Sequence, residues 1–332
     1  MIEEVTGLDF LDFISIGEVL IQLNSIAPGP LRYSRYFEVH VAGSEFNVLA
    51  ALSKLGFLTG LITRVGRDEF GEMIIRAMRA ENIDTSLVKT MDDAPTGVYF
   101  IQRHYPVPGK STVFYYRHGS AASLMSEEDV REEYVLKSKR VFLTGITPAL
   151  SDSCYSAVRK LHSIARDNGR EIFFDTNIRL KLWRSAEKAR ARLTPLLEGS
   201  KIVFTNKEDI QILYPQKTLQ EAVSSVFDLD VDLVVVKSGE EGSTVYSRSG
   251  ESHHEKAYFT PVIEDVIGAG DAFDAVFIAS VIKGYSLKDS LKLANLAGML
   301  VVTTRGDVEA QPDWKALEAL KKYYDEKIDM LR

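Results

Sequence analysis

Short apolar segments rich in β-branched and aromatic residues alternate along the chain with longer segments of helical periodicity. We predict strands at 13–17, 59–66, 140–145, 171–177, 202–206 and 233–239. We predict helices at 45–55, 69–81, 152–168, 185–197, 206–213, 217–226, 271–284, 287–303 and 313–328. Strands that alternate with helices form βαβ units, and such units build a sheet in which most strands run parallel. The sequence therefore predicts an α/β fold with a mostly parallel central sheet flanked by helices.

Several predicted strands end in a small or polar residue. These residues are Gly17, Gly145, Asp175, Asn206 and Gly239. In open α/β sheets, ligands bind outside the carboxyl ends of the strands. We therefore expect the functional site at this edge of the sheet.

Two stretches interrupt the alternation. Residues 19–41 contain APGPLRYSRYFEVHV, and residues 96–118 read as a hairpin around a Pro-Gly turn at 106–109. Both are rich in aromatic residues, so we predict that they form one small, discontinuous β lid on a single domain spanning 1–332. A lid of this kind excludes water from a site, and its surface can also serve self-association. A structural excursion without either role is the alternative.

Charge and composition limit the partners of the chain. The 332 residues carry a formal net charge of −7, which argues against nucleic-acid binding. No run approaches the roughly 18 apolar residues of a membrane span, and the acidic start, MIEEVTGLDF, lacks the positive charges of a signal peptide. The single cysteine, Cys154, excludes a disulfide within the chain and fits a reducing compartment. We therefore expect a cytoplasmic protein that binds neither nucleic acid nor membrane.

A glycine-rich turn precedes a predicted helix in the segment DVIGAGDAFDAVF, residues 265–277. The backbone N–H groups of such a turn, together with a helix amino terminus, bind anions such as phosphate. Asp271 directly follows Gly268, Ala269 and Gly270. Its carboxylate would stand beside a bound phosphoryl group and accept a proton from an attacking hydroxyl. An ordinary turn that leads into a helix is the alternative.

This segment resembles the carboxy-terminal signature of the ribokinase-like (PfkB) carbohydrate kinases. The resemblance covers nearly the whole chain, because AGSEFNVLAALSKLG at 42–56 is similar to the amino-terminal glycine motif and RVGRDEFGEMI at 64–74 follows at the usual place. It implies a ribokinase-like fold and a kinase that uses ATP and Mg²⁺. It also implies that Asp271 is the catalytic base and that the 268–270 turn stabilises the developing charge.

The same resemblance assigns nucleotide contacts. VVKSGEEGS at 235–243 is similar to the strand and loop that lie along the nucleotide in the family. The implied ATP contacts, in addition to the 268–270 turn, are Lys237, Ser238, Gly239, Glu240, Glu241 and Gly242.

Further motifs resemble kinases of 2-keto-3-deoxygluconate, especially those of archaea. They are GEVLIQLNSIAPGPLRY, TGVYFIQR, VFYYRHGSAAS, LTGITPALS, DTNIRLKLW and TRGD. The resemblance implies substrate contacts from Gly43, Tyr99, Tyr115, Tyr116, Arg117, Arg179, Asp271 and Asp307. It also implies that Asn177, Ile178 and Arg179 face both the substrate and the nucleotide. The implied reaction is ATP-dependent phosphorylation of 2-keto-3-deoxy-D-gluconate, or also of 2-keto-3-deoxy-D-galactonate, to the 6-phosphate in Entner–Doudoroff-type catabolism.

Residue chemistry agrees with an acidic sugar. Arginine binds a carboxylate well, because its planar guanidinium donates two parallel hydrogen bonds. Arg117 ends an aromatic strand of the predicted lid, and Arg179 follows the strand end DTN. An ordinary surface cation is the alternative interpretation for each of them.

The predicted metal site departs from the family pattern. Members commonly carry an Asn-x-x-Glu string that organises the magnesium shell, whereas this chain has NKED, from Asn206 to Asp209. The shorter carboxylate can still act through water, because Mg²⁺ retains several waters in protein sites. We therefore expect Asn206 and Asp209 to act on Mg²⁺ indirectly, with Glu208 as the neighbouring alternative.

Other functions stay open on the sequence. A kinase of the same fold for fructose, ribose or a nucleoside would not need Arg117 and Arg179. A non-catalytic sugar-binding protein on this scaffold would not need the carboxylate of Asp271. A dinucleotide-binding oxidoreductase is disfavoured, because GEVLIQ at 17–22 lacks the glycine-rich turn that follows the first strand in such proteins. The aromatic appendage also predicts a homo-oligomer.

Overall fold

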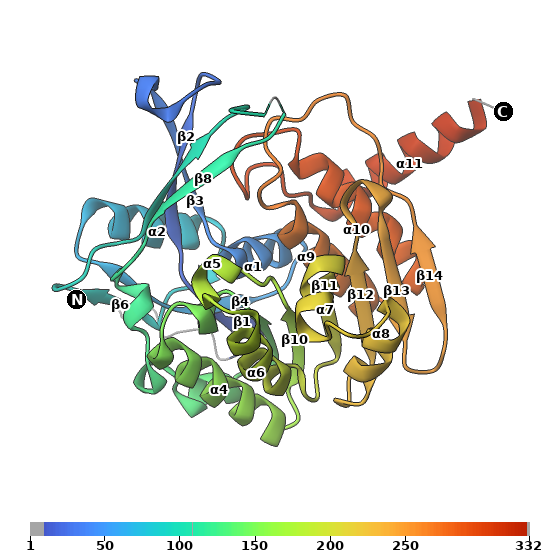
Figure 1. Cartoon of the computed structure of the whole chain (residues 1–332), viewed down its shortest axis with the longest axis horizontal. Coiled ribbons are helices and arrows are strands. Elements are labelled where there is room, and N and C mark those ends of the chain that lie inside the picture. Colours follow the sequence, from blue (N-terminus) through green and yellow to red (C-terminus); the bar gives the residue numbers. More distant parts are fainter. Residues whose placement is uncertain (1–9, 108, 331–332) are drawn as a thin grey trace.

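The structure is a computed structural model that describes residues 10–107 and 109–330. Residues 1–9 of the acidic amino-terminal segment and Pro108 of the predicted Pro-Gly turn lie outside the described residues. Two sheets form the framework, a large one covered by helices and a small one that rises from it (Figure 1). No helix within the described ranges is long and apolar enough to span a lipid bilayer.

In the described part of the chain, ten strands form the large sheet. They are β1 (Leu11–Ile16), β4 (Thr59–Gly66), β5 (Ile83–Asp84), β6 (Val88–Met91), β9 (Ser138–Thr144), β10 (Glu171–Asp175), β11 (Ile202–Asn206), β12 (Leu233–Lys237), β13 (Ser243–Ser247) and β14 (Ser252–Glu255). Their order is β14-β13-β12-β11-β10-β9-β1-β4-β5, and β6 also pairs with β4. The strands from β12 to β5 run parallel, and β13 and β14 run antiparallel. The predicted mostly parallel sheet is confirmed.

All six predicted strands are present, each within two residues of its expected bounds. The strands β5, β6, β13 and β14 were not predicted. These strands are short, and β13 and β14 form an antiparallel edge with the sequences STVYS and SHHE. An edge with a solvent-exposed face needs few apolar residues, so its pattern is weak.

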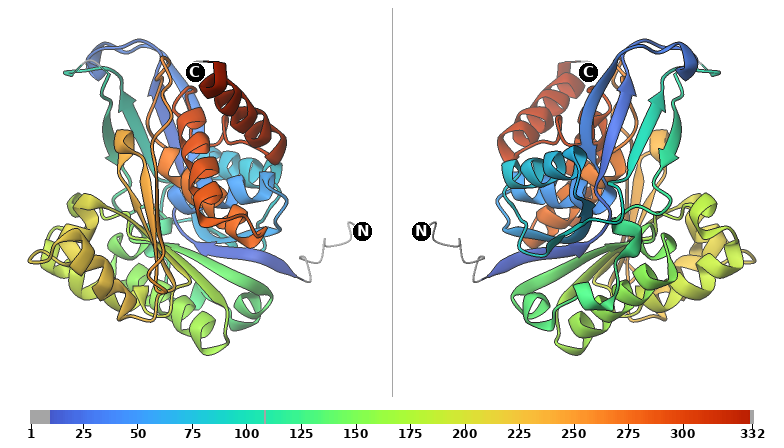
Figure 2. Two further views of the ribbon diagram at one scale, coloured as in Figure 1. Left: turned by 90° about the vertical axis from the view of Figure 1, so that its right-hand side faces the viewer. Right: turned by 90° about the vertical axis from the view of Figure 1, so that its left-hand side faces the viewer.

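Helices cover both faces of the large sheet (Figure 2). One layer contains α1 (Ser44–Lys54), α2 (Glu69–Ala80), α9 (Ala269–Ile282), α10 (Leu287–Val301) and α11 (Trp314–Met330). The other contains α3 (Glu132–Leu136), α4 (Asp152–Asp167), α5 (Leu180–Trp183), α6 (Ala186–Leu197), α7 (Lys207–Leu213) and α8 (Leu219–Phe227). Every predicted helix is present with both ends within two residues of expectation. The missed helices α3 and α5 are too short to show helical periodicity.

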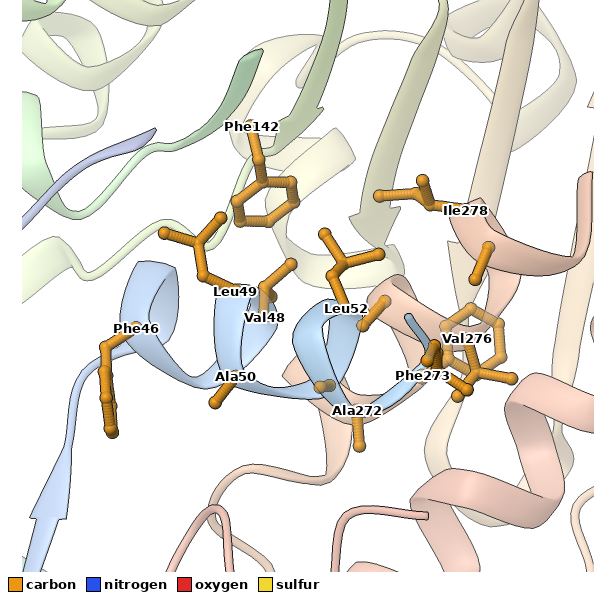
Figure 3. Packing of buried hydrophobic residues seen from close by; sticks show 14 of the residues in the cluster. Phe46, Val48, Leu49, Ala50, Leu52, Phe142, Ala272, Phe273, Val276 and Ile278 are labelled. Atoms are coloured by element: carbon orange, nitrogen blue, oxygen red, sulfur yellow. The ribbon is translucent and has the colours of Figure 1, made fainter. Parts of the chain in front are cut away.

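Alternate residues of the central strands enter two separate hydrophobic cores. Phe13, Phe142 and Phe173 pack in the layer of α1 and α9, whereas Ile14 and Phe174 pack in the opposite layer. Successive side chains of a strand point to opposite faces, so a strand that is covered on both sides is apolar throughout. Figure 3 shows Phe142 above α1, with residues of α9 beside that helix. Truncation of such a buried phenylalanine to alanine costs about 3–5 kcal/mol, so this packing holds α9 firmly against the sheet.

The small sheet consists of β2 (Leu20–Ser25), β3 (Phe37–Ala42), β7 (Val98–Gln102) and β8 (Thr112–Tyr116), in the order β3-β2-β7-β8. It comes from the two stretches that were predicted to interrupt the alternation, and the predicted hairpin is the antiparallel pair β7 and β8. The stretches meet where β2 pairs in parallel with β7. Tyr99 and Ile101 lie on the inner face and pack with Ile267, whereas Phe114 and Tyr116 on the outer face are exposed.

Candidate active site

The predicted glycine-rich turn forms the amino terminus of α9. Gly268 precedes the helix with a φ of 81°, a left-handed conformation that glycine adopts readily. A Cβ atom on Gly268 would also lie 3.1 Å from the Cα atom of Asp307. The first intrahelical hydrogen bond, 3.0 Å long, runs from the N–H of Ala272 to the carbonyl of Gly268. The N–H groups of residues 269–271 therefore lie ahead of the helical hydrogen bonds and can bind an anion.

Asp271 lies in the first turn of α9 and is buried. Its Oδ1 atom accepts a hydrogen bond of 2.7 Å from Ser44 Oγ, and its Oδ2 atom accepts one of 2.7 Å from Asn47 Nδ2. Burial raises the pKa of Asp271, and these two hydrogen bonds oppose the rise. Among the described residues, both side-chain donors to this carboxylate are neutral, so no ion pair cancels its charge.

Asp307 is a second buried carboxylate beside Asp271. Asn47 Nδ2 bridges the two, because it also donates to Asp307 Oδ2 at 2.9 Å. Gln22 Nε2, on β2, donates to Asp307 Oδ1 at 2.8 Å and to the hydroxyl oxygen of Tyr99 at 2.7 Å. Burial, followed by the negative charge of Asp271, raises the pKa of Asp307 to about 7. The small sheet and the large domain therefore meet in one polar cluster.

The start of α1 orients the bridging amide. The N–H of Gly43 donates to Asn47 Oδ1 at 3.2 Å, which directs the amide nitrogen of Asn47 toward the two carboxylates. A Cβ atom on Gly43 would collide with the carbonyl oxygen of Glu18. Only glycine permits this close approach, so the predicted substrate contact Gly43 also has a structural role.

The predicted tyrosines lie on two faces of the small sheet. Tyr99 and Tyr115 share the inner face, with ring centroids 5.3 Å apart. Tyr116 lies on the outer face, where its ring packs edge-on against Phe100 at 5.5 Å. Neighbouring residues of a strand point to opposite faces. The structure therefore brings Tyr99 and Tyr115 toward the polar cluster and directs Tyr116 away from it.

The two predicted arginines have different surroundings. Arg117 follows β8, and its Nε atom donates to the nearly fully buried carboxylate of Glu18 at 2.6 Å. Ser120 donates to the same carboxylate. Arg179 lies exposed at the start of α5, with no ion-pair partner among the described residues. Arg117 is thus occupied by a protein carboxylate, whereas Arg179 is open to solvent.

The loop after β10 contacts the start of α1. Asn177 has a φ of 30° and donates from Nδ2 to Ser44 Oγ at 3.1 Å. Ser44 in turn donates to Asp271, so the predicted contact Asn177 joins the hydrogen bonds of the α9 turn. Ile178 is buried beside it.

The predicted metal residues Asn206 and Asp209 make hydrogen bonds that hold the same loop after β10 in place. Asp209 Oδ2 accepts hydrogen bonds from Thr176 Oγ1 at 2.8 Å and from the N–H of Ile178 at 2.9 Å. Asn206 caps α7 by accepting the N–H of Asp209 at 2.7 Å. Within residues 10–107 and 109–330, no group of three or more His, Cys, Asp or Glu side chains is arranged to hold a metal ion.

Lys237 lies beneath the α9 turn at the end of β12. Its Nζ atom is 3.0 Å from Asp175 Oδ2 and 2.9 Å from each carboxylate oxygen of Asp274. A Cβ atom on Gly270 would lie 3.7 Å from this nitrogen. The other predicted nucleotide residues follow Lys237 directly, in a turn closed by a 2.8 Å hydrogen bond from the N–H of Ser238 to the carbonyl of Gly242.

Four members of the site were not predicted as such. They are Gln22, Ser44, Asn47 and Asp274. Ser44 and Asn47 stand inside the motif at 42–56, and Asp274 follows Asp271 by three residues, which places both on one side of α9. Gln22 gave no such signal, because β2 has the sequence LIQLNS and is half polar.

Known proteins resemble this chain over nearly its full length. Residues 11–314 match the description pfkB family carbohydrate kinase. A 2-dehydro-3-deoxygluconokinase of Thermoproteus tenax is 42% identical over 313 residues, which cover 94% of this chain and 94% of the relative. A 5-dehydro-2-deoxygluconokinase of Bacillus licheniformis is 30% identical over 313 residues, which cover 93% of this chain and 95% of the relative.

A solved structure agrees with these relatives. It is an E. coli protein described as a ribokinase II, in complex with ATP and Mg²⁺, and it superposes with a TM-score of 0.87 at 26% identity. The match covers 95% of this chain and 100% of that one. The predicted ribokinase-like fold is therefore confirmed, and the chain belongs to the pfkB family of carbohydrate kinases.

Proposed function

We propose that this chain transfers the γ-phosphoryl group of ATP to 2-keto-3-deoxy-D-gluconate (2-dehydro-3-deoxygluconate) and forms the 6-phosphate. The T. tenax relative carries the name of this activity, and the B. licheniformis relative is named for a related sugar acid. The match to the T. tenax relative spans 94% of both chains. Two relatives named for dehydro-deoxygluconates support a sugar acid as the substrate class.

The observation that carries the proposal is the position of Asp271. Its buried carboxylate stands at the anion-binding end of α9 and is held by Ser44 and Asn47 alone among the described side chains. A carboxylate that is not paired with a cation can accept a proton more readily, and burial raises the pKa of Asp271. These are the properties that a base for a sugar hydroxyl needs.

In the proposed reaction, the terminal hydroxyl oxygen of the sugar acid attacks the γ-phosphorus of ATP. The bond between that phosphorus and the bridging oxygen of ADP breaks, and ADP leaves with the bond's electron pair. Asp271 accepts the hydroxyl proton. The N–H groups of residues 269–271 stabilise the charge on the transferred group, which is the main catalytic demand in phosphoryl transfer.

Polar side chains around the cluster would bind the sugar. Asp307 suits the sugar hydroxyls, and Tyr99 and Tyr115 would line the substrate on the inner face of the small sheet. Arg179, which is exposed and unpaired among the described residues, suits the substrate carboxylate. Arg117 would join it only if its bond to Glu18 opens or is shared.

The nucleotide and its metal would lie at the carboxyl edge of the large sheet. Residues 177–179 and 237–242 leave β10 and β12 at this edge, and α9 begins beside them. The related E. coli structure contains ATP and Mg²⁺. Mg²⁺ offsets the charge of the nucleotide phosphates when it is bound. Asn206 and Asp209 would act on it through water, since their side chains already bind the protein.

Three further expectations accompany this function. The small sheet would act as a lid, because its inner face contributes Gln22 and Tyr99 to the site. Its exposed outer face, with Phe114 and Tyr116, supports a homo-oligomer. The single cysteine, which is buried, supports a cytoplasmic protein.

A kinase of the same fold for a neutral sugar or nucleoside is the second candidate. The ion pair between Arg117 and Glu18 favours it, because a neutral substrate would leave that pair undisturbed. A non-catalytic sugar-binding protein is the third candidate, and the geometry around Asp271 disfavours it.

The test is ADP release from ATP and Mg²⁺ with a panel of acceptors. The panel contains both 2-keto-3-deoxy sugar acids, 5-keto-2-deoxygluconate, fructose, ribose and adenosine. We expect turnover on 2-keto-3-deoxygluconate, and a fall in kcat of roughly 10²–10⁴-fold in Asp271→Asn at similar KM. Turnover on a neutral acceptor would replace the proposed substrate class. Ligand binding without turnover on any acceptor would favour the non-catalytic protein.

A further inference from the structure

Three ionisable side chains form a network directly beneath the proposed phosphoryl site, in which Asp175 and Asp274 are buried and Lys237 is partly exposed. Lys237 Nζ lies 3.0 Å from Asp175 Oδ2 and 2.9 Å from both carboxylate oxygens of Asp274. Asp274 has no exposed surface, and Asp175 is 4% exposed. The ammonium group has three N–H donors and three acceptor atoms within reach. We call Asp175, Lys237 and Asp274 the lysine network.

The lysine network joins parts of the fold that do not touch through the sheet. Asp175 ends β10 and Lys237 ends β12, but β11 lies between these strands. The side chain of Lys237 lies over Phe204 of the intervening strand β11, and its Nζ atom is 5.7 Å from the centroid of that ring. Asp274 comes from the second turn of α9. The network therefore ties two strand ends to the helix that carries Asp271.

The lysine network lies next to the α9 turn and also next to the loop whose side chains hold Asp271. Gly270 lies close enough to Lys237 that a Cβ atom there would be 3.7 Å from Nζ. Asp175 directly precedes the loop in which Asn177 donates to Ser44, and Ser44 donates to Asp271. A shift of the network would move the anion-binding turn and the donors of Asp271 together.

We propose that Lys237 is a positioning residue, which acts through Asp175 and Asp274 to hold the α9 turn and to set the charge felt by Asp271, rather than a direct ligand of the nucleotide. All three donors of its ammonium group are already used by carboxylates in this arrangement. This inference rests on the proposed kinase function for its consequence in catalysis, but the geometry and the charge effect can be measured separately.

The charges around Asp271 support this role. Lys237 lowers the pKa of Asp271, and Asp175 raises it. Burial raises the pKa of Asp274 well above its ordinary value, and a hydrogen bond with Asp175 adds to the rise. The charged groups that face Asp271 from the elements packed around it are Glu45 on α1, Asp175 on β10, Lys237 on β12, Asp307 on the loop before α11 and Asp274 on α9 itself.

The experiment compares Lys237→Met with the double variant Lys237→Met/Asp274→Leu. The single variant leaves two buried carboxylates without a cation, so we expect it to lose thermal stability. The double variant replaces the pair by apolar groups, which often restores stability. Both variants lack the lysine charge, so we expect the pKa of Asp271 to rise by about one unit in each. We also expect kcat to fall by roughly 30-fold in each, with the acid limb of the kcat profile moved to higher pH.

The pKa of Asp271 is measured by NMR titration of ¹³C-labelled aspartate carboxyl groups in the unliganded protein, with Asp271→Asn to assign the signal. Lys201→Met is the matched control, because Lys201 is an exposed lysine that pairs with Asp232 at 2.8 Å away from the site. We expect it to change neither the titration nor kcat.

Recovery of both stability and kcat in the double variant, with an unmoved Asp271 titration, would reduce Lys237 to an ordinary packing partner and overturn the proposal. A fall in kcat/KM that comes only from a higher KM for ATP, with kcat and the Asp271 titration unchanged, would make Lys237 a direct nucleotide ligand. Absence of turnover in the native protein would refute the proposed function alone, since the titration still tests the network.

Discussion

Asp271 and Asp274 stand one turn apart on α9, yet their carboxylates are held in different ways. Asp271 and its neighbour Asp307 accept hydrogen bonds from neutral amide and hydroxyl groups. Asp274 shares an ammonium group with Asp175. Neutral donors fix the position of a carboxylate without cancelling its charge, whereas a paired cation cancels it. The arrangement around Asp271 suits a catalytic base, and the arrangement around Asp274 suits a residue that holds the helix in position.

The same division extends across the site. Glu45, on α1, accepts hydrogen bonds from the hydroxyl groups of Thr144 and Thr147, both at 2.6 Å, and burial raises its pKa to about 6. Glu18 is instead paired with Arg117. Carboxylates held by neutral donors therefore lie around Asp271, and those held by cations lie beneath it or at the base of the small sheet. Three experiments test whether this difference matters.

The largest expected effect comes from breaking a cation-held carboxylate at the base of the small sheet. Arg117→Met would leave the buried charge of Glu18 without its cation, which costs about 3–5 kcal/mol of unfolding free energy. Arg179→Met is the control, because Arg179 is exposed and should contribute little to stability. Urea denaturation measures both. Equal stability of the two variants would mean that the Arg117 pair does not hold the small sheet.

A smaller effect is expected from a neutral donor. Asn47→Leu removes the amide that bridges Asp271 and Asp307, so each carboxylate loses one of its two side-chain hydrogen bonds, both of which lower its pKa. We expect kcat/KM for the sugar acid to fall by roughly 100-fold, because a lost donor to a buried charge costs about 1–3 kcal/mol. The acid limb of its pH profile should move upward.

The matched control for this experiment is Asn295→Leu. Asn295 lies on α10 and donates to the carbonyl of Glu255 at 3.1 Å, away from the two carboxylates. Its replacement should leave kcat/KM and the pH profile unchanged. A fall in kcat/KM for Asn47→Leu without any change in the profile would show that the amide binds substrate but does not govern Asp271.

The smallest effect concerns stability as a function of pH. The pKa of Asp307 is raised to about 7 in the folded chain, against about 4 in the unfolded chain. Between these values the folded state keeps a proton that the unfolded state has lost, so stability falls as pH rises from about 4 to 7. Asp307→Asn should therefore gain about 1–2 kcal/mol relative to the native protein between pH 5 and pH 7. Urea titrations across this range measure the difference, and parallel pH curves would contradict the raised pKa.

Much of this architecture was predictable from local sequence. The strands β4 and β11 lie at the expected residues, and the small sheet comes from the two expected stretches. The turn at 268–270 precedes α9 as its glycines indicated. These features depend on alternation, helical periodicity and glycine conformation, which are read over a few neighbouring residues. The polar edge strands β13 and β14 lack such a pattern and were missed.

The sequence by itself determined the order of elements and the residue types that meet at the carboxyl edge of the large sheet. The tertiary structure alone decided their partners. Asn47 reaches Asp307 across 260 positions, and Arg117 finds Glu18 rather than an open site. Whether two side chains meet depends on the order of strands in the sheet and on the face to which each residue points. Those relations arise when distant segments pack together, because the free energy that fixes them belongs to the assembled core and not to any single segment.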